Sequence, residues 1–120
     1  MPQAFEHGAA LFNAGRFFEA HEAFEELLDE VEEDRRWDFL VALIQVAVGY
    51  HKLVSGHAGA SRMLGLGLEK LAAFPDESWG VDVAGLRARV AEDRADLEAW
   101  RSVDDRLTAD PPRIATASPR

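Results

Sequence analysis

Hydrophobic residues recur at intervals of three and four along almost the whole chain, and no stretch alternates between apolar and polar positions long enough to predict a strand. This pattern is typical of amphipathic helices, so we expect an all-α protein. Gly15 and Gly56 follow apolar stretches where glycine commonly ends a helix, and Asp82 is placed to cap the last helix. The pattern predicts a single compact bundle of about five helices, at residues 3–14, 16–33, 37–54, 58–73 and 83–106.

The helix expected at residues 37–54 is apolar on nearly all sides, which predicts that it is the central and most buried element. It carries one polar strip of residues spaced by seven: Asp38, Gln45 and Lys52. His51 falls among apolar residues instead, so we expect its side chain to face the core. The longest nearly apolar run, residues 39–50, is interrupted by Gln45 and is shorter than the roughly 20 residues that span a bilayer.

The pattern predicts one domain over residues 1–107 and a disordered tail over residues 108–120, because this last segment contains three prolines and few large apolar residues. Residues 11–24 resemble the helix-turn-helix of a tetratricopeptide repeat. The next 34 residues do not repeat this pattern, and repeat arrays need about three units to bury their faces. We therefore expect one local helical hairpin and no solenoid.

The 120 residues include 22 acidic and 13 basic side chains, which gives a formal net charge of −9. Proteins that bind nucleic acids or acidic membrane surfaces use Lys and Arg for this contact, so we expect neither partner. The absence of cysteine excludes disulfides and thiolate chemistry. The first residues lack the basic and apolar regions of a secretory signal peptide, and we expect a cytoplasmic protein.

The negative charge is concentrated in one segment, because residues 19–38 contain ten acidic and two basic side chains, a net charge of −8. A solvated helix face explains such a segment in most proteins. The alternative is that these carboxylates bind a basic partner.

A candidate chemical site lies within this acidic segment, where residues 21–25 form an H-E-x-x-E motif. His21 and Glu25 are one helical turn apart, so they share one side of the helix. The motif resembles the H-E-x-x-H of zinc hydrolases with Glu25 in place of the second histidine. His21 and Glu25 could therefore bind a divalent metal ion while Glu22 acts as the base.

His51 is the third candidate, because a buried imidazole needs hydrogen-bond partners or a metal. The preceding helix offers His21 and Glu25, and we expect His51 to meet this pair between the two helices. Two alternatives follow from this arrangement. The cluster is either a structural polar network or a site at which His21, Glu25 and His51 bind a metal or substrate, with Glu22 or Asp29 assisting.

Three other features suggest weaker hypotheses. Residues 56–62 open a helix with free amides and could hold an anion, or they form a close-packed turn. The glycines of the helix at residues 58–73 predict close helix packing and leave room for a homodimer contact. The three tryptophans are expected to be core or loop anchors: Trp37, Trp79 and Trp100.

The motifs of this chain resemble those of the small all-α proteins of domain of unknown function family 309. The resemblance spans about residues 8–100 and is carried by the segment G-R-F-F-E-A-H-E at residues 15–22 with Glu25, by L-I-Q-V-A at residues 43–47 leading to His51, and by the glycines after it. It implies a compact all-α fold and implies no activity. The matched positions include four residues that helical geometry also selects: His21, Glu22, Glu25 and His51.

The sequence supports two functions of different class. The first is a metal-dependent or acid–base enzyme, hydrolase-like, whose site contains His21, Glu22, Glu25 and His51. The second is a non-enzymatic helical protein-interaction module in which the acidic face of the second helix docks a basic partner and the His/Glu cluster is structural. The acids that would carry this docking are Glu26, Glu30 and Glu33, and the partner is a protein or an unidentified small molecule.

Overall fold

The computed structural model describes residues 3–116 and confirms the all-α fold. These residues form six helices and one two-stranded antiparallel sheet. In chain order the elements are α1 (Gln3–Asn13), α2 (Phe17–Leu28), α3 (Asp34–Val54), α4 (Ala60–Leu71), β1 (Glu77–Ser78), β2 (Val81–Asp82), α5 (Val83–Glu98) and α6 (Asp104–Ala109).

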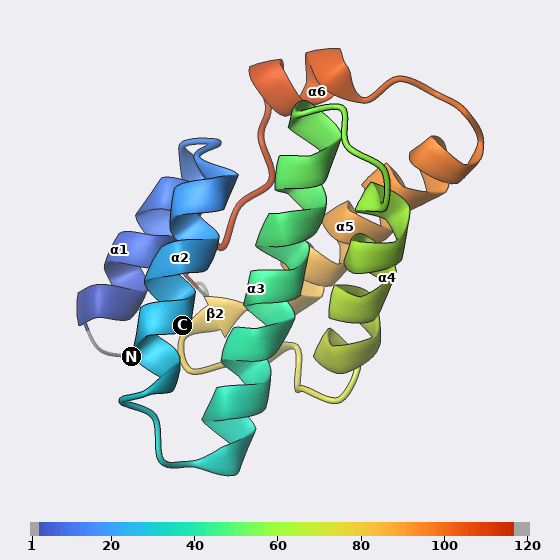
Figure 1. Cartoon of the computed structure of the whole chain (residues 1–120). Helices are drawn as coiled ribbons and strands as arrows, with labels where there is room; N and C mark the ends of the chain where they lie inside the picture. Colours follow the sequence, from blue (N-terminus) through green and yellow to red (C-terminus); the bar gives the residue numbers. More distant parts are fainter. Residues whose placement is uncertain (1–2, 117–120) are drawn as a thin grey trace.

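Helix α3 is the centre of the fold, with α2 packed along one side and α4 along the other (Figure 1). Helix α1 packs on α2, and α5 packs on α4. The side of α3 that faces these helices is fully buried and includes Phe39, Leu43, Val46 and Tyr50. By length and composition alone α3 meets the requirement for a membrane span, and 44% of this apolar stretch is buried within the protein. The central helix of a bundle has the same composition, and this is the place that α3 occupies.

The predicted helix ends at Gly15 and Gly56 are confirmed. At the end of α1 the amide of Gly15 donates to the carbonyl of Phe12 at 2.9 Å, and the amide of Arg16 donates to that of Leu11 at 2.9 Å. Gly15 has a φ of +80°, which glycine adopts without steric cost. Asp82 caps α5 as predicted, because its side chain accepts from the amide of Gly85 at 2.9 Å.

The second helix ends at Leu28 instead of residue 33, and the third begins at Asp34 instead of residue 37. The acidic residues between them explain both differences. Carboxylates are unfavourable at the C-terminal end of a helix and favourable at the N-terminal end, because of the helix dipole. The acidic residues among positions 29–34 therefore lie outside α2, in the connection before α3 and in its first turn, and Glu33 is the N-cap of α3.

The helix expected at residues 83–106 is interrupted. Helix α5 ends where the amide of Trp100 donates to the carbonyl of Leu97 at 3.1 Å and the amide of Arg101 donates to that of Asp96 at 2.8 Å. Trp100 occupies the left-handed position with a φ of +61°, and its side chain is 95% exposed. The expectation that Trp100 is a core or loop anchor is therefore wrong. Trp79 does pack inside, with its ring 5.2 Å from that of Phe39.

Replacing Trp100 by glycine is expected to raise the free energy of unfolding by about 1 kcal/mol. A left-handed non-glycine residue costs about 1–2 kcal/mol, and the added backbone freedom of glycine in the unfolded chain offsets part of this gain. Chemical denaturation measures the change. Trp100→Ala is the control, since it removes the exposed indole and retains the strain; a gain in stability as large as that of Trp100→Gly would contradict the explanation.

Residues 108–116 differ from the disordered tail that composition suggests. Helix α6 continues to Ala109, and the segment after it returns to α1 and β2. The side chain of Asn13 accepts from the amide of Ile114 at 2.7 Å and donates to its carbonyl at 3.2 Å, and the amide of Asp82 donates to the carbonyl of Ala115 at 2.9 Å. Ile114 is buried among the core residues. Residues 117–120 of the expected tail lie outside the described residues.

The glycines of α4 allow close helix packing, as predicted. A Cβ atom at Gly67 would lie 2.6 Å from Val46 Cγ2 of α3, and one at Gly65 would lie 2.8 Å from Arg94 Cζ of α5. At Gly67 the close atom belongs to the buried Val46, so this position has no space for a side chain, whereas at Gly65 the end of the flexible Arg94 side chain would have to move. The two glycines serve contacts within the chain.

Candidate functional site

His21 and Glu25 form the pair that the sequence predicts, on the flank of α2 that faces α3. The Nδ1 atom of His21 lies 2.7 Å from the carbonyl oxygen of Phe18. A carbonyl only accepts hydrogen bonds, so Nδ1 carries the proton and donates it. The Nε2 atom lies 3.5 Å from Oε1 of Glu25. Glu22 is exposed and makes no hydrogen bond or ion pair with described residues.

His51 is half-buried at the surface and does not face the core, which corrects the sequence-based expectation. Its ring centre lies 5.1 Å from that of Phe18, which lies 5.0 Å from that of His21. Phe18 therefore connects the two histidines. Ser55 Oγ lies 3.4 Å from Nδ1 of His51, and the ring of His57 lies 6.3 Å away. We call His21, His51, His57 and Phe18 the histidine cluster.

The predicted metal ligands are not gathered into a metal-binding group. Within residues 3–116, His, Asp and Glu side chains form no group of three or more that could hold a metal ion. His51 forms no hydrogen bond or ion pair with His21 or Glu25 in this part of the chain. The pair of His21 and Glu25 lies at an open surface, where water screens their interaction. The arrangement orients an imidazole and lacks the third ligand of the predicted site.

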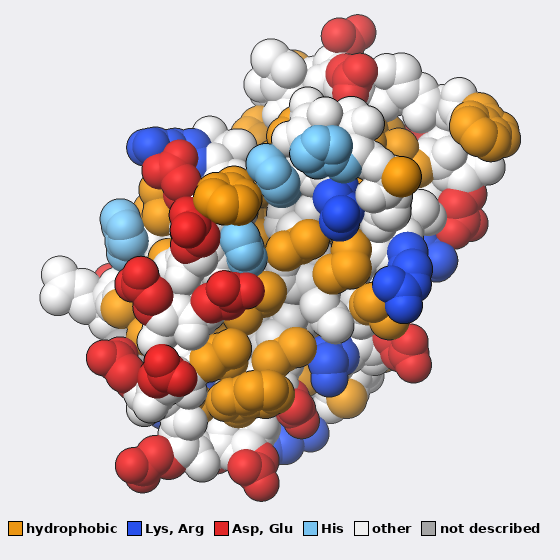
Figure 2. Space-filling model, viewed as in Figure 1, with side chains coloured by type: hydrophobic (Ala, Val, Ile, Leu, Met, Phe, Trp, Pro, Cys, Tyr) orange, Lys and Arg blue, Asp and Glu red, His pale blue; other side chains and the backbone are white. Residues whose placement is uncertain are grey.

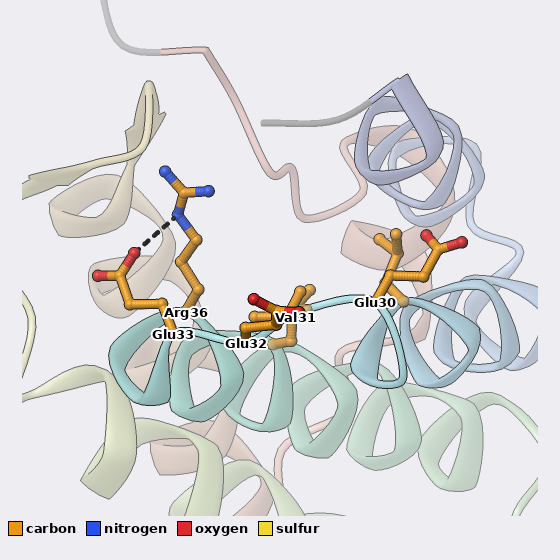
Figure 3. A pocket seen from close by; sticks show the side chains of 7 residues that line it. Glu30, Val31, Glu32, Glu33 and Arg36 are labelled. Carbon is orange, nitrogen blue, oxygen red and sulfur yellow. Dashed lines mark ion pairs between the residues drawn. The ribbon is translucent and has the colours of Figure 1, made fainter.

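A cavity of about 290 Å³ lies at the connection between α2 and α3 (Figure 3). It is lined by Leu27, Glu30, Val31, Glu32, Glu33, Arg36 and Leu40. Glu33 and Arg36 point toward one another, and Oε2 of Glu33 lies 3.4 Å from Nε of Arg36. This Nε atom is buried, and the orientation of the pair does not give it a hydrogen bond. Glu30 and Glu33 therefore line a loop and do not extend the acidic face of α2. No histidine reaches this cavity, so it is separate from the predicted site.

The solvent side of α3 carries a continuous row of apolar side chains, which we call the apolar stripe: Trp37, Val41, Ile44 and Val48. Trp37 is 44% exposed and the other three are half-buried. Their spacing of four, three and four residues is the heptad spacing of helices that pack against a partner helix. In Figure 2 hydrophobic side chains run down the middle of this face, and histidines surround its upper end.

Acidic and basic side chains lie on opposite sides of the apolar stripe. Figure 2 shows acidic groups over α2 and basic groups toward α4. The acidic flank consists of exposed residues of α2 and its C-cap: Glu22, Glu25 and Asp29. The basic flank contains the half-buried Lys52 and Lys70 and the exposed Asp38, which shares a strip of α3 with Lys52, so this flank keeps one net positive charge. Ser61 and Gly65 of α4 contact Arg94 of α5. Lys70 lies on the opposite side of α4, away from α5, and therefore belongs to the basic flank.

Phe18 is a surface residue that the sequence did not single out. Phe18 is 48% exposed and sits at the upper end of the apolar stripe beside the histidines. The sequence did contain a signal for its exposure, because Phe18 is an aromatic residue that lies outside the apolar positions of α2. Those positions, 17, 20, 24 and 27, are buried. The apolar stripe gave no separate signal, since α3 is apolar on nearly all sides.

A second cluster joins α3, α5 and α6 around the fully buried carboxyl group of Asp93. Tyr50 donates to its Oδ2 at 2.5 Å, Arg89 donates to the same oxygen at 3.0 Å, and Nε of Arg106 donates to Oδ1 at 2.9 Å. Asp93 falls on the apolar face of α5, seven residues after Leu86, and this spacing could have identified it.

The titration of this cluster follows from its contacts. Burial, together with the hydrogen bond to Asp93, raises the pKa of Tyr50 far above its ordinary value. The hydrogen bond from Arg106 lowers the pKa of Asp96, and the hydrogen bond to Asp93 raises the pKa of Arg106. Every group around Asp93 is engaged by another, so the cluster is a structural connection between three helices.

The sequence model of a protein family described as "Domain of unknown function (DUF309)" matches residues 5–64. This half of the chain contains α1, α2, α3 and the first turn of α4, and therefore the apolar stripe, the acidic flank and the histidine cluster. No curated protein matches the chain.

Proposed function

Because the chain belongs to the DUF309 family, whose description assigns no function, we propose on structural grounds that it is a non-enzymatic helical protein-interaction module. The observation that carries this proposal is the half-exposed apolar stripe between an acidic and a basic flank. We call the stripe, Phe18 and the two flanks together the docking face.

The exposed apolar side chains support docking. Two large aromatic residues, Phe18 and Trp37, each leave nearly half of their surface in contact with water. Contiguous apolar patches on a protein surface commonly mark interaction sites, because covering them contributes about 25 cal/mol for each Å² removed from water. Tryptophan is also among the residues that contribute most to binding at protein interfaces. The face thus contains the type of side chain that stabilises a complex.

The shape and charge of the face define the class of partner. A row of apolar residues at heptad spacing fits a second amphipathic helix, whose own apolar side packs along it. The carboxylates of Glu22, Glu25 and Asp29 favour Lys or Arg at the edge of that helix which lies over α2. The partner is therefore a protein helix that is apolar on one side and basic along one edge.

The histidine cluster has a structural role in this proposal. The rings of His21 and His51, whose centres lie 5.0 and 5.1 Å from that of Phe18, hold the exposed aromatic ring at the end of the stripe. The alternative, a metal-dependent or acid–base site formed by His21, Glu22, Glu25 and His51, has less support. It requires that these groups converge, and His51 makes neither a hydrogen bond nor an ion pair with the others among the described residues.

The proposal is tested with a synthetic 18-residue amphipathic helix of leucine and lysine, labelled for fluorescence anisotropy. We expect it to bind the full chain, and Trp37→Ser to weaken this binding about tenfold, because a central aromatic contact of about 1.4 kcal/mol is lost. A peptide of leucine and glutamate should not bind. Equal binding of the two peptides, or unchanged binding to Trp37→Ser, would contradict the proposal.

A matched pair of charge variants separates the docking face from general electrostatic attraction. The first variant converts Glu22, Glu25 and Asp29 to lysine. The second converts three exposed acids outside the face, Glu69, Glu77 and Asp105, and changes the net charge by the same amount. The first variant should lose binding of the leucine–lysine peptide, whereas the second should retain most of it. Equal losses would show that the peptide responds only to the net charge.

A further inference from the structure

The docking face is complementary to itself. One flank is acidic, the other flank is basic, and the stripe between them is apolar, so a single face presents both an apolar surface and the basic edge that its acidic flank attracts. This inference rests on the proposed function, since it names the partner helix that the docking face binds.

Contacts within the chain show that Glu25 and Lys70 lie at the same level along α3. Helix α2 runs antiparallel to α3, and Phe18 contacts His51. Glu25 follows Phe18 by seven residues, about 10 Å, and is therefore level with Ile44. Helix α4 also runs antiparallel to α3, and Gly67 lies against Val46. Lys70 follows Gly67 by three residues and is therefore level with residue 43 of α3. Glu25 is level with Ile44, so the two side chains differ by one residue along α3.

The position of a two-fold axis decides which flanks meet. An axis parallel to α3 and lying in the interface exchanges the two flanks and preserves the level of each residue. The acidic flank of one copy then faces the basic flank of the other, and Glu25 faces Lys70 of the partner subunit twice. An axis across α3 would place acidic flank against acidic flank, which charge repulsion disfavours.

The spacing of the apolar stripe supports the same axis. Residues at alternating intervals of four and three form the seam of parallel two-stranded helix pairs, in which each residue packs beside its counterpart. Trp37, Val41, Ile44 and Val48 follow this spacing along the exposed side of α3. The axis that pairs the charges is therefore also the axis that packs the two stripes.

We propose that this chain forms a symmetric homodimer through its docking face, with the two α3 helices parallel and each Glu25 opposite Lys70 of the partner subunit. The apolar stripes of the two copies cover one another. The glycines of α4 take no part in this contact, because they pack against α3 and α5 within each chain.

Sedimentation equilibrium of the full chain tests the dimer and its geometry. The wild-type protein should be dimeric at micromolar concentrations. Glu25→Lys alone, or Lys70→Glu alone, converts two attractive contacts into two repulsive ones and should weaken the dimer about tenfold. An equimolar mixture of the two variants should restore dimerisation, because in the mixed dimer each introduced charge meets its opposite. Glu69→Lys, on the exposed side of α4, is the matched control and should leave the dimer unchanged.

The outcomes separate this inference from the proposed function. A wild-type chain that stays monomeric up to millimolar concentration and still binds the leucine–lysine peptide through Trp37 would overturn the dimer and leave the interaction module standing. A monomer that does not bind the peptide would overturn both. A dimer that is unaffected by Glu25→Lys, Lys70→Glu and Trp37→Ser, or a mixture that does not restore dimerisation, would show that two copies do not meet at this face.

Discussion

Replacing Asp93 by alanine is expected to lower the free energy of unfolding by about 3–5 kcal/mol, because breaking a buried ion pair leaves its partners without compensation. The side chain of Asp93 is fully buried and accepts hydrogen bonds from Tyr50, Arg89 and Arg106. Alanine would leave the Tyr50 hydroxyl and the guanidinium groups without this acceptor. It would also remove the hydrogen bond between Tyr50 of α3 and α5, and it would leave α6 tied to α5 by the ion pairs of Arg106 with Glu92 and Asp96.

Chemical denaturation followed by circular dichroism measures this loss, and Glu92→Ala is the matched control. Glu92 is one residue away, its side chain is 57% exposed, and it forms an ion pair of 3.1 Å with Arg106. An exposed pair of this kind contributes about 0–1 kcal/mol. If Asp93→Ala cost no more than Glu92→Ala, the central role of Asp93 in the cluster would be wrong. Hydrogen exchange should also show faster opening of α6 in Asp93→Ala.

Raising the pH above 10 is expected to unfold the protein through ionisation of Tyr50. Burial and the hydrogen bond to Asp93 raise the pKa of Tyr50 in the folded protein far above its ordinary value of 10.0. The unfolded chain then loses this proton at a lower pH than the folded chain. The contribution of Tyr50 to stability is therefore complete below pH 10 and falls above it, by about 1.4 kcal/mol for each pH unit.

The chain contains one tyrosine, so the phenolate absorbance near 295 nm reports Tyr50 alone. We expect no phenolate signal from the folded protein at pH 10–11, and we expect the signal to rise together with the loss of helical circular dichroism. Tyr50→Phe retains the ring and should reduce the dependence of stability on pH above 10 by one proton. Phenolate formation near pH 10 in a protein that keeps its helices would contradict the predicted burial of the hydroxyl.

The two sides of α3 have different tasks in this fold. Tyr50 projects from the side that α5 and α6 hold through Asp93, whereas Ile44 and Val48 lie on the side that remains half-exposed. The contacts behind α3 hold it in place, and this rigidity allows its exposed side to present side chains at fixed spacing. A partner helix then binds a preformed surface, which lowers the entropic cost of binding.

The features that the sequence predicted correctly depend on neighbouring residues in the chain. Helices follow from apolar periodicity, and the ends at Gly15 and Gly56 follow from the conformational freedom of glycine. The pair of His21 and Glu25 follows from the helical turn, which places residues four apart on one side in any helix. None of these features requires knowledge of which helix packs against which.

The position of His51 shows what the sequence could not decide. His51 lies among apolar residues of α3, and this indicated burial. Helix α3 has only one polar strip, and this strip does not show how far the exposed side extends around the helix. The arrangement of α2, α4 and α5 around α3 determines which side of α3 is buried. It leaves His51, Ile44 and Val48 at the surface.

The Asp93 cluster and the C-terminal segment were decided in the same way. A carboxyl group is stable in the interior when Arg89, Arg106 and Tyr50 converge on it, and these groups come from three helices. Ile114 is ordered by contacts with Asn13, about a hundred residues earlier in the chain. The sequence by itself determined the helices, their ends and the pair on α2, because these depend on local geometry. The tertiary structure decided which side chains are buried, paired or left for a partner, because burial depends on contacts between distant segments.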